Sequence, residues 1–148
     1  MTIFQRYSIL IFLVCTCTVW GQGNKKEQTH PIVGSWTYDA STFEASLEQS
    51  SKRRLDTIPQ HKLTIRGYYV GRTETFAPDG RYTITLADGS TLQAQWAAQN
   101  NNIVLVTTPS GDVFRKRISF PAPGRMVIES IASGNTKSVM NALHFIKN

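Results

Sequence analysis

From about residue 62 onward, apolar and polar side chains alternate in short runs that are separated by turn sequences. Alternation with a period of two, punctuated by Gly, Pro, Asn and Asp, predicts β-strands joined by hairpins. The turn sequences are Pro78-Asp79-Gly80, Asp88-Gly89, Asn100-Asn101-Asn102, Ser110-Gly111-Asp112, Pro121-Ala122-Pro123-Gly124 and Ser133-Gly134-Asn135. Strands are predicted over residues 33–38, 62–77, 81–87, 91–98, 103–108, 113–120, 125–132 and 137–146. Eight antiparallel strands with tight connections predict an up-and-down β-barrel.

One amphipathic helix is predicted between the first and second strands, over residues 42–57. Ser41 and Glu44 have the spacing of a capping box at its start, and Pro59 ends it. Its apolar positions share one face: Phe43, Leu47, Leu55 and Ile58. The predicted fold class is therefore all-β with one helix, which lies across one mouth of the barrel or along its wall.

Loop lengths predict the pairing of neighbouring strands. Three-residue loops place Phe76 opposite Tyr82 and Ile84 opposite Leu92. A two-residue Asn100-Asn101 turn places Trp96 opposite Leu105. A loop over residues 122–124 places Phe120 opposite Met126 and Ile118 opposite Ile128. The predicted interior contains Phe76, Tyr82, Ile84, Leu86, Leu92, Ala94, Trp96, Ile103, Leu105, Phe114, Ile118, Phe120, Met126 and Ile128.

Three charged residues share this predicted interior: Arg72, Glu74 and Lys116. A buried charge is costly unless it is paired, so they indicate either a mutual ion pair or a site for the polar end of a ligand. Two alternatives place them in water, namely a bulge at Gly71 that turns Arg72 and Glu74 outward, or a wet barrel rim.

The sequence carries no pattern of a metal site or an enzyme. The histidines, at 30, 61 and 144, lack metal-ligand spacing. No nucleophile elbow, phosphate loop or paired-carboxylate signature is present. We therefore expect no enzymatic activity, no cofactor and no metal, although Glu74 as a general acid or base is a third hypothesis for the function.

Residues 1–21 have the layout of a secretory signal peptide. Arg6 precedes an apolar run over residues 9–14 that is too short to span a bilayer comfortably, and cleavage is predicted before Gln22. Cleavage would remove both Cys15 and Cys17, so the exported chain would contain no disulfide. A lipoprotein anchored through one of these cysteines is the alternative, but the residues before them fit it poorly. We expect secreted or periplasmic localisation.

The exported chain would comprise a disordered leader over residues 22–30 and one barrel domain over residues 31–148. Loss of Arg6 reduces the net charge from +6 to +5. The basic clusters Lys52-Arg53-Arg54 and Arg115-Lys116-Arg117 lack the interleaved aromatic residues of a nucleic-acid module, so no nucleic-acid partner is expected.

Two short motifs carry a resemblance to a known group. Gly34-Ser35-Trp36 begins the first predicted strand, and residues 76–82 form an aromatic-x-x-Asp-Gly-x-Tyr hairpin. The chain thus resembles the lipocalins and the wider calycin group, in particular small lipocalin-like domains of exported bacterial proteins. The resemblance implies that Trp36 closes one end of the barrel against a basic residue, for which Lys137 is the candidate. A helix after the first strand and the loss of both cysteines depart from typical lipocalins.

These observations predict an exported lipocalin-like binding protein that holds a small, largely apolar or amphipathic ligand. The predicted ligand contacts are the aromatic residues Tyr82, Trp96 and Phe114, with Arg72, Glu74 or Lys116 orienting a polar end. The alternative is a barrel with a solid core that acts as a structural or protein-interaction module of the cell envelope.

Overall fold

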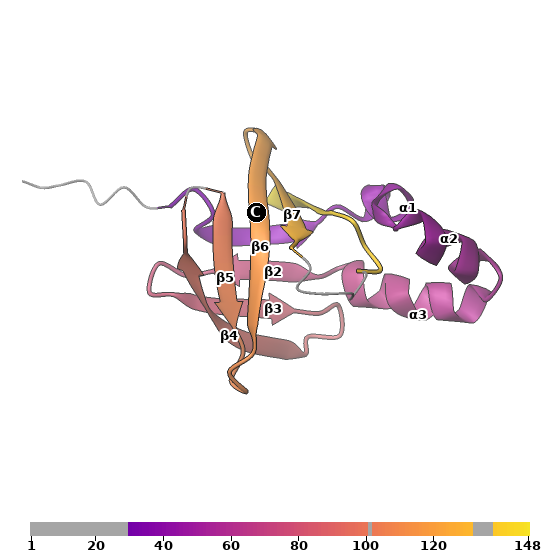
Figure 1. Cartoon of the computed structure of the whole chain (residues 1–148), viewed down its shortest axis with the longest axis horizontal. Coiled ribbons are helices and arrows are strands. Elements are labelled where there is room, and N and C mark those ends of the chain that lie inside the picture. Colours follow the sequence, from indigo (N-terminus) through magenta and orange to yellow (C-terminus); the bar gives the residue numbers. More distant parts are fainter. Residues whose placement is uncertain (1–29, 101, 132–137) are drawn as a thin grey trace, which may run out of the picture.

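Eight antiparallel strands form a closed barrel in the computed structural model of the chain (Figure 1). The structure describes residues 30–100, 102–131 and 138–148. The strands are β1 (Gly34–Tyr38), β2 (Thr73–Phe76), β3 (Arg81–Thr85), β4 (Thr91–Ala98), β5 (Ile103–Thr107), β6 (Val113–Ala122), β7 (Arg125–Ser130) and β8 (Leu143–Lys147). Each strand pairs with the next along the chain, and β8 pairs with β1. The predicted signal peptide and nearly all of the predicted leader lie outside the described residues.

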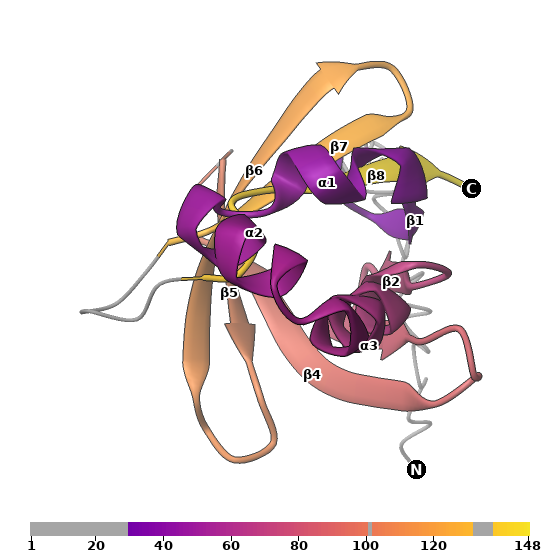
Figure 2. The ribbon, with the colours of Figure 1, turned by 90° about the vertical axis from the view of Figure 1, so that its right-hand side faces the viewer.

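The chain between β1 and β2 is helical, but not as the single helix predicted. A short 3-10 helix, η1 (Ala40–Thr42), is followed by α1 (Phe43–Ser46), α2 (Gln49–Asp56) and α3 (Pro59–Tyr69). The predicted helix is interrupted at Leu47, where the backbone is extended and bridges to Met140. Figures 1 and 2 show these helices gathered at one end of the barrel.

The prediction of a strand from residue 62 was wrong for its first half. Pro59 does not only end a helix; it occupies the first turn of α3, where its fixed φ favours helix and its missing N–H costs nothing. Residues 62–69 therefore continue as helix, and β2 begins only at Thr73. The last predicted strand was also too long, since β8 begins at Leu143.

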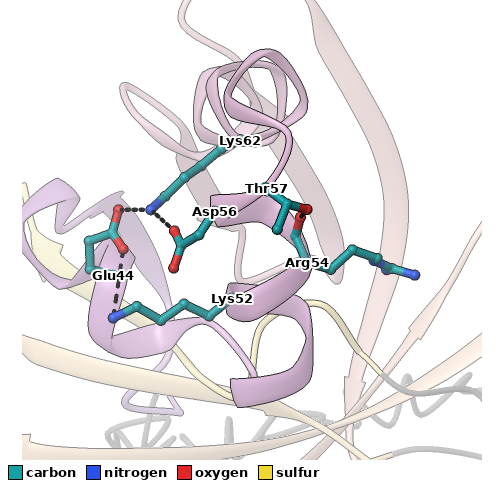
Figure 3. Close-up of polar contacts among 6 residues, drawn as sticks. All are labelled: Glu44, Lys52, Arg54, Asp56, Thr57 and Lys62. Atoms are coloured by element: carbon teal, nitrogen blue, oxygen red, sulfur yellow. Dashed lines mark hydrogen bonds and ion pairs between the residues drawn. The ribbon is translucent and has the colours of Figure 1, made fainter.

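The predicted capping box does not form. Ser41 instead hydrogen-bonds to Asp39, and no side chain caps α1. Glu44 pairs with Lys62 across 2.9 Å and with Lys52 across 3.9 Å, and Lys62 also contacts Asp56 at 2.7 Å (Figure 3). These pairs join the three α-helices, but they lie at the surface, where solvent screens them, so their contribution to stability is small.

Apolar burial holds the helices more firmly than these ion pairs. As predicted, Phe43, Leu47 and Leu55 are buried, and they belong to the same core cluster as the barrel residues. Ile58, the fourth residue of the predicted face, is 40% exposed because α2 has ended before it.

The first two predicted hairpins are confirmed. Phe76 lies opposite Tyr82, and Ile84 lies opposite Leu92. Each loop has three residues and ends in a glycine with positive φ, +89° at Gly80 and +82° at Gly89. Glycine adopts this conformation without steric cost, which is why the Asp-Gly turns fix the register.

The predicted register between β4 and β5 was wrong by one residue. Trp96 lies opposite Val106, not Leu105. The connecting loop has one residue more than the predicted turn, because the Gln99 amide donates to the Ile103 carbonyl at 2.8 Å. A slip of one residue reverses every side chain of a strand. Val104 and Val106 are therefore buried inside, while the predicted interior residues Ile103 and Leu105 are half-buried on the other face.

Between β6 and β7, Ile118 lies opposite Ile128 as predicted. A bulge between Ser119 and Ala122 shifts the register beyond this point, so Phe120 does not follow the predicted pairing with Met126.

A dense apolar core fills one end of the barrel. The indole N–H of Trp36 donates to the Ile32 carbonyl at 2.7 Å, and its ring lies 5.8 Å from that of Phe120. The Lys147 ammonium lies 5.2 Å from the centre of the Trp36 ring, a distance at which a cation is attracted to the ring face. The basic residue expected over Trp36 is thus supplied by Lys147; Lys137 lies outside the described residues.

Candidate functional site

A cleft opens into the barrel where β4 and β5 part. β4 pairs with β5 only from Gln95 onward, and its first residues, 91–94, pair with β3 alone. Figure 2 shows the β5–β6 hairpin turned away from the start of β4. The cleft between them has a volume of about 660 Å³. Its apolar lining consists of Tyr82, Ile84, Leu92, Ala94, Val106, Pro109 and Phe114.

Two large apolar side chains in this cleft remain accessible to solvent. Phe114 lies opposite Val106 and Leu92 lies opposite Ile84, so both have the inward phase of their strands. Nevertheless Phe114 is 53% exposed and Leu92 is 60% exposed. Inward side chains with this exposure mean that the barrel is not filled at this place, and exposed apolar surface of this kind is typical of binding sites.

Beneath the cleft lies Glu74, a fully buried carboxylate. Tyr82 donates a 2.5 Å hydrogen bond to its Oε2, and Arg72 forms an ion pair with its Oε1. Of the interpretations left open by the sequence, the mutual ion pair therefore holds for Arg72 and Glu74. Gly71 does adopt positive φ, +81°, but Glu74 still faces inward.

Burial and charge set the protonation of the two donors. Burial raises the pKa of Tyr82 well above its usual 10.0, and the charge of Glu74 raises it further. For Arg72, burial is the largest single effect and acts to lower the pKa, but the charge and hydrogen bond of Glu74, together with the electrostatic effects of Tyr82 and Tyr69, outweigh it and the pKa is raised. At neutral pH Tyr82 is thus a neutral donor and Arg72 is a cation, and both oxygens of Glu74 are occupied.

Lys116 is the second cation of this interior. It lies on β6 opposite Val104 and Ser130, and its side chain lines the cleft. Within residues 30–100, 102–131 and 138–148, no hydrogen bond or ion pair joins its ammonium to another side chain. Burial lowers the pKa of Lys116, an effect that the charge of Glu74 opposes and that of Arg72 reinforces.

The structure brings together most of the predicted site residues. Tyr82, Phe114 and Lys116 line the cleft, while Arg72 and Glu74 lie behind Tyr82. Trp96 does not line the cleft. Its indole N–H donates to the Ala77 carbonyl at 2.9 Å, and its ring packs edge-on against Phe76 at 5.7 Å in the filled end of the barrel.

Several residues of the site were missed at the level of sequence, among them Val106 and Tyr69. Val106 was placed on the outer face by the wrong register of β5. The ring centre of Tyr69, at the end of α3, lies 5.6 Å from the guanidinium carbon of Arg72. Tyr69 was missed because residues 62–77 were predicted to form a strand. Near it the hydroxyl of Tyr38 and Nε of Arg72 are buried without a hydrogen-bond partner among the described residues.

No group of three or more His, Cys, Asp or Glu side chains that could hold a metal occurs among the described residues. Nor does any described helix have the length and apolar content needed to cross a membrane. The sequence matches no family model, and no curated protein shows detectable similarity to it.

Proposed function

We propose that the protein is an exported lipocalin-like, up-and-down barrel that binds a small, largely apolar ligand in the cleft between β4 and the β5–β6 hairpin. The observation that carries the proposal is the exposure of Leu92 and Phe114 inside an otherwise closed barrel. Covering apolar surface lowers the free energy of a complex by about 25 cal/mol for each Å² that is removed from water. Burial of these side chains by a ligand would therefore favour binding.

The size of the cleft supports the same proposal. Pockets for small ligands measure roughly 300–1,000 Å³, and the cleft, at about 660 Å³, falls within this range. The alternative, a solid-core barrel that acts as a structural or protein-interaction module, would have these inward side chains packed and covered. A negative result in the binding test would therefore favour this second function.

A neutral solvatochromic dye, Nile red, tests the proposal without involving charge. We expect its emission to increase and shift to the blue on binding. Ala94→Phe, which places a ring in the cleft, should weaken binding at least tenfold. Ala97→Phe is the matched control, because Ala97 lies on the opposite face of β4 and is exposed. Unchanged dye emission with the wild-type protein, or equal binding by both variants, would contradict the proposal.

Native mass spectrometry of protein purified from its source supplies an independent test. We expect a bound molecule that is lost from Ala94→Phe. The same sample tests export: the N-terminus of the exported chain should be Gln22, and an unprocessed chain that begins at Met1 would contradict the proposed signal peptide.

A further inference from the structure

We propose that the ligand is an amphipathic anion whose charged head binds to Lys116 while its apolar part lies against Leu92 and Phe114; this rests on the function proposed above. The inference begins with the position of Lys116. Its neighbours in register, Val104 and Ser130, hold it in the middle of the barrel wall, and its side chain reaches the same cleft as the apolar lining.

The interior carboxylate is not the direct partner of this ammonium in the structure. Both oxygens of Glu74 are already engaged, one by Arg72 and the other by Tyr82. The charge of Glu74 acts on Lys116 only through space, and that of Arg72 repels it. Among the described residues the interior therefore contains two cations, Arg72 and Lys116, but one carboxylate, Glu74.

An unpaired ammonium in a partly apolar cleft is costly, and an anion that enters the cleft removes that cost. A neutral apolar ligand would instead cover Lys116 without compensating its charge. A cationic ligand would be repelled by both Lys116 and Arg72. Selectivity among amphipathic molecules should thus follow the charge of the head, because the apolar contacts are common to all of them.

Calorimetry with decanoate and decanol tests this inference, since the two molecules share a ten-carbon chain and differ in head charge. For the wild-type protein we expect roughly 10- to 100-fold tighter binding of decanoate, the range for a hydrogen bond to a charged group. Lys116→Met should lose that preference and bind decanoate and decanol with similar affinity. Lys116→Arg, which keeps the charge, should retain most of it.

Lys52→Met is the matched control, because it removes the same charge from an exposed site on α2. It should bind decanoate as the wild type does. A thermal melt of each variant establishes that it is folded. Equal binding of decanoate and decanol by the wild type, or full decanoate binding by Lys116→Met, would overturn the inference and leave the proposed function standing. If neither molecule binds and Nile red does not bind, both proposals fall.

Discussion

The phenolic hydroxyl of Tyr82 lies 2.5 Å from Oε2 of Glu74 and supplies one of the two side-chain partners of that buried carboxylate. Tyr82→Phe removes the hydroxyl and keeps the ring. We expect a loss of about 1–3 kcal/mol in the free energy of unfolding, because a charged acceptor would remain buried with one donor fewer. Urea denaturation measures the loss. Tyr68→Phe, at a tyrosine that is 58% exposed, should change stability by less than about 0.5 kcal/mol.

The ion pair between Arg72 and Glu74 should be costly to break and cheaper to replace. Glu74→Gln leaves the Arg72 guanidinium buried without its counter-charge, for which we expect a loss of about 3–5 kcal/mol. The double variant Arg72→Met with Glu74→Gln should recover part of that loss. The exposed pair of Arg117 and Glu129 provides the comparison, and Glu129→Gln should cost about 0–1 kcal/mol. Equal losses at the two sites would show that burial does not govern the energy of the pair.

Stability should depend on pH through Lys116. Burial lowers the pKa of Lys116 in the folded chain below its usual value of 10.5. At a pH between the folded and the unfolded pKa, the unfolded chain therefore binds more protons than the folded chain. Folding is therefore penalised at neutral pH, and the penalty is relieved as pH rises towards 10.5.

A comparison with Lys116→Met isolates this effect. The variant should be more stable than the wild type at neutral pH, and its advantage should shrink as pH rises. The nearby groups Glu74, Arg72 and Tyr82 are present in both proteins, so their titration largely cancels in the difference. Urea denaturation from pH 7 to pH 10 measures it, and an advantage independent of pH would contradict the lowered pKa.

Gly71 is required for two separate reasons, and a paired substitution separates them. Its φ is +81°, and a Cβ added there would lie 2.9 Å from the Cβ of Ala87. Gly89 has nearly the same φ, +82°, with nothing within 4 Å of such a Cβ. Both Gly→Ala variants should lose about 1–2 kcal/mol from backbone strain.

Gly71→Ala should lose a further 1 kcal/mol or so from the steric contact. In the double variant Gly71→Ala with Ala87→Gly, only the stability lost through the steric contact should be recovered. Equal melting curves for Gly71→Ala and Gly89→Ala would show that the loop moves aside without cost.

The barrel was predictable from the sequence because turn chemistry is local. Asp79-Gly80 and Asp88-Gly89 each set a three-residue loop through one glycine, and the strand pairing follows by counting. The asparagine turn between β4 and β5 carries no such constraint. Several loop lengths suit consecutive asparagines, and one extra residue reversed Val106 and Leu105.

The interruption of the predicted helix and the position of the cleft were not predicted, because they depend on contacts between residues far apart in the sequence. Leu47 leaves the helical conformation to pair with Met140, 93 residues later in the chain. Trp96 has the inward phase that was predicted, yet it packs on Phe76 because β4 pairs with β5 at that level. Periodicity gives the side on which a residue lies but not its height along the barrel, which decides between packed core and open cleft.

The early separation of β4 from β5 also determines the chemistry of the cleft wall. Alternate residues of a strand direct their N–H and C=O groups to opposite neighbours. From Thr91 to Ala94, β4 has a strand partner on only one side, so the remaining main-chain groups face the gap. A ligand bound as proposed would therefore lie against a row of peptide groups while it covers Leu92 and Phe114. We expect the affinity of the proposed ligand to depend on hydrogen bonding to this backbone as well as on apolar contact.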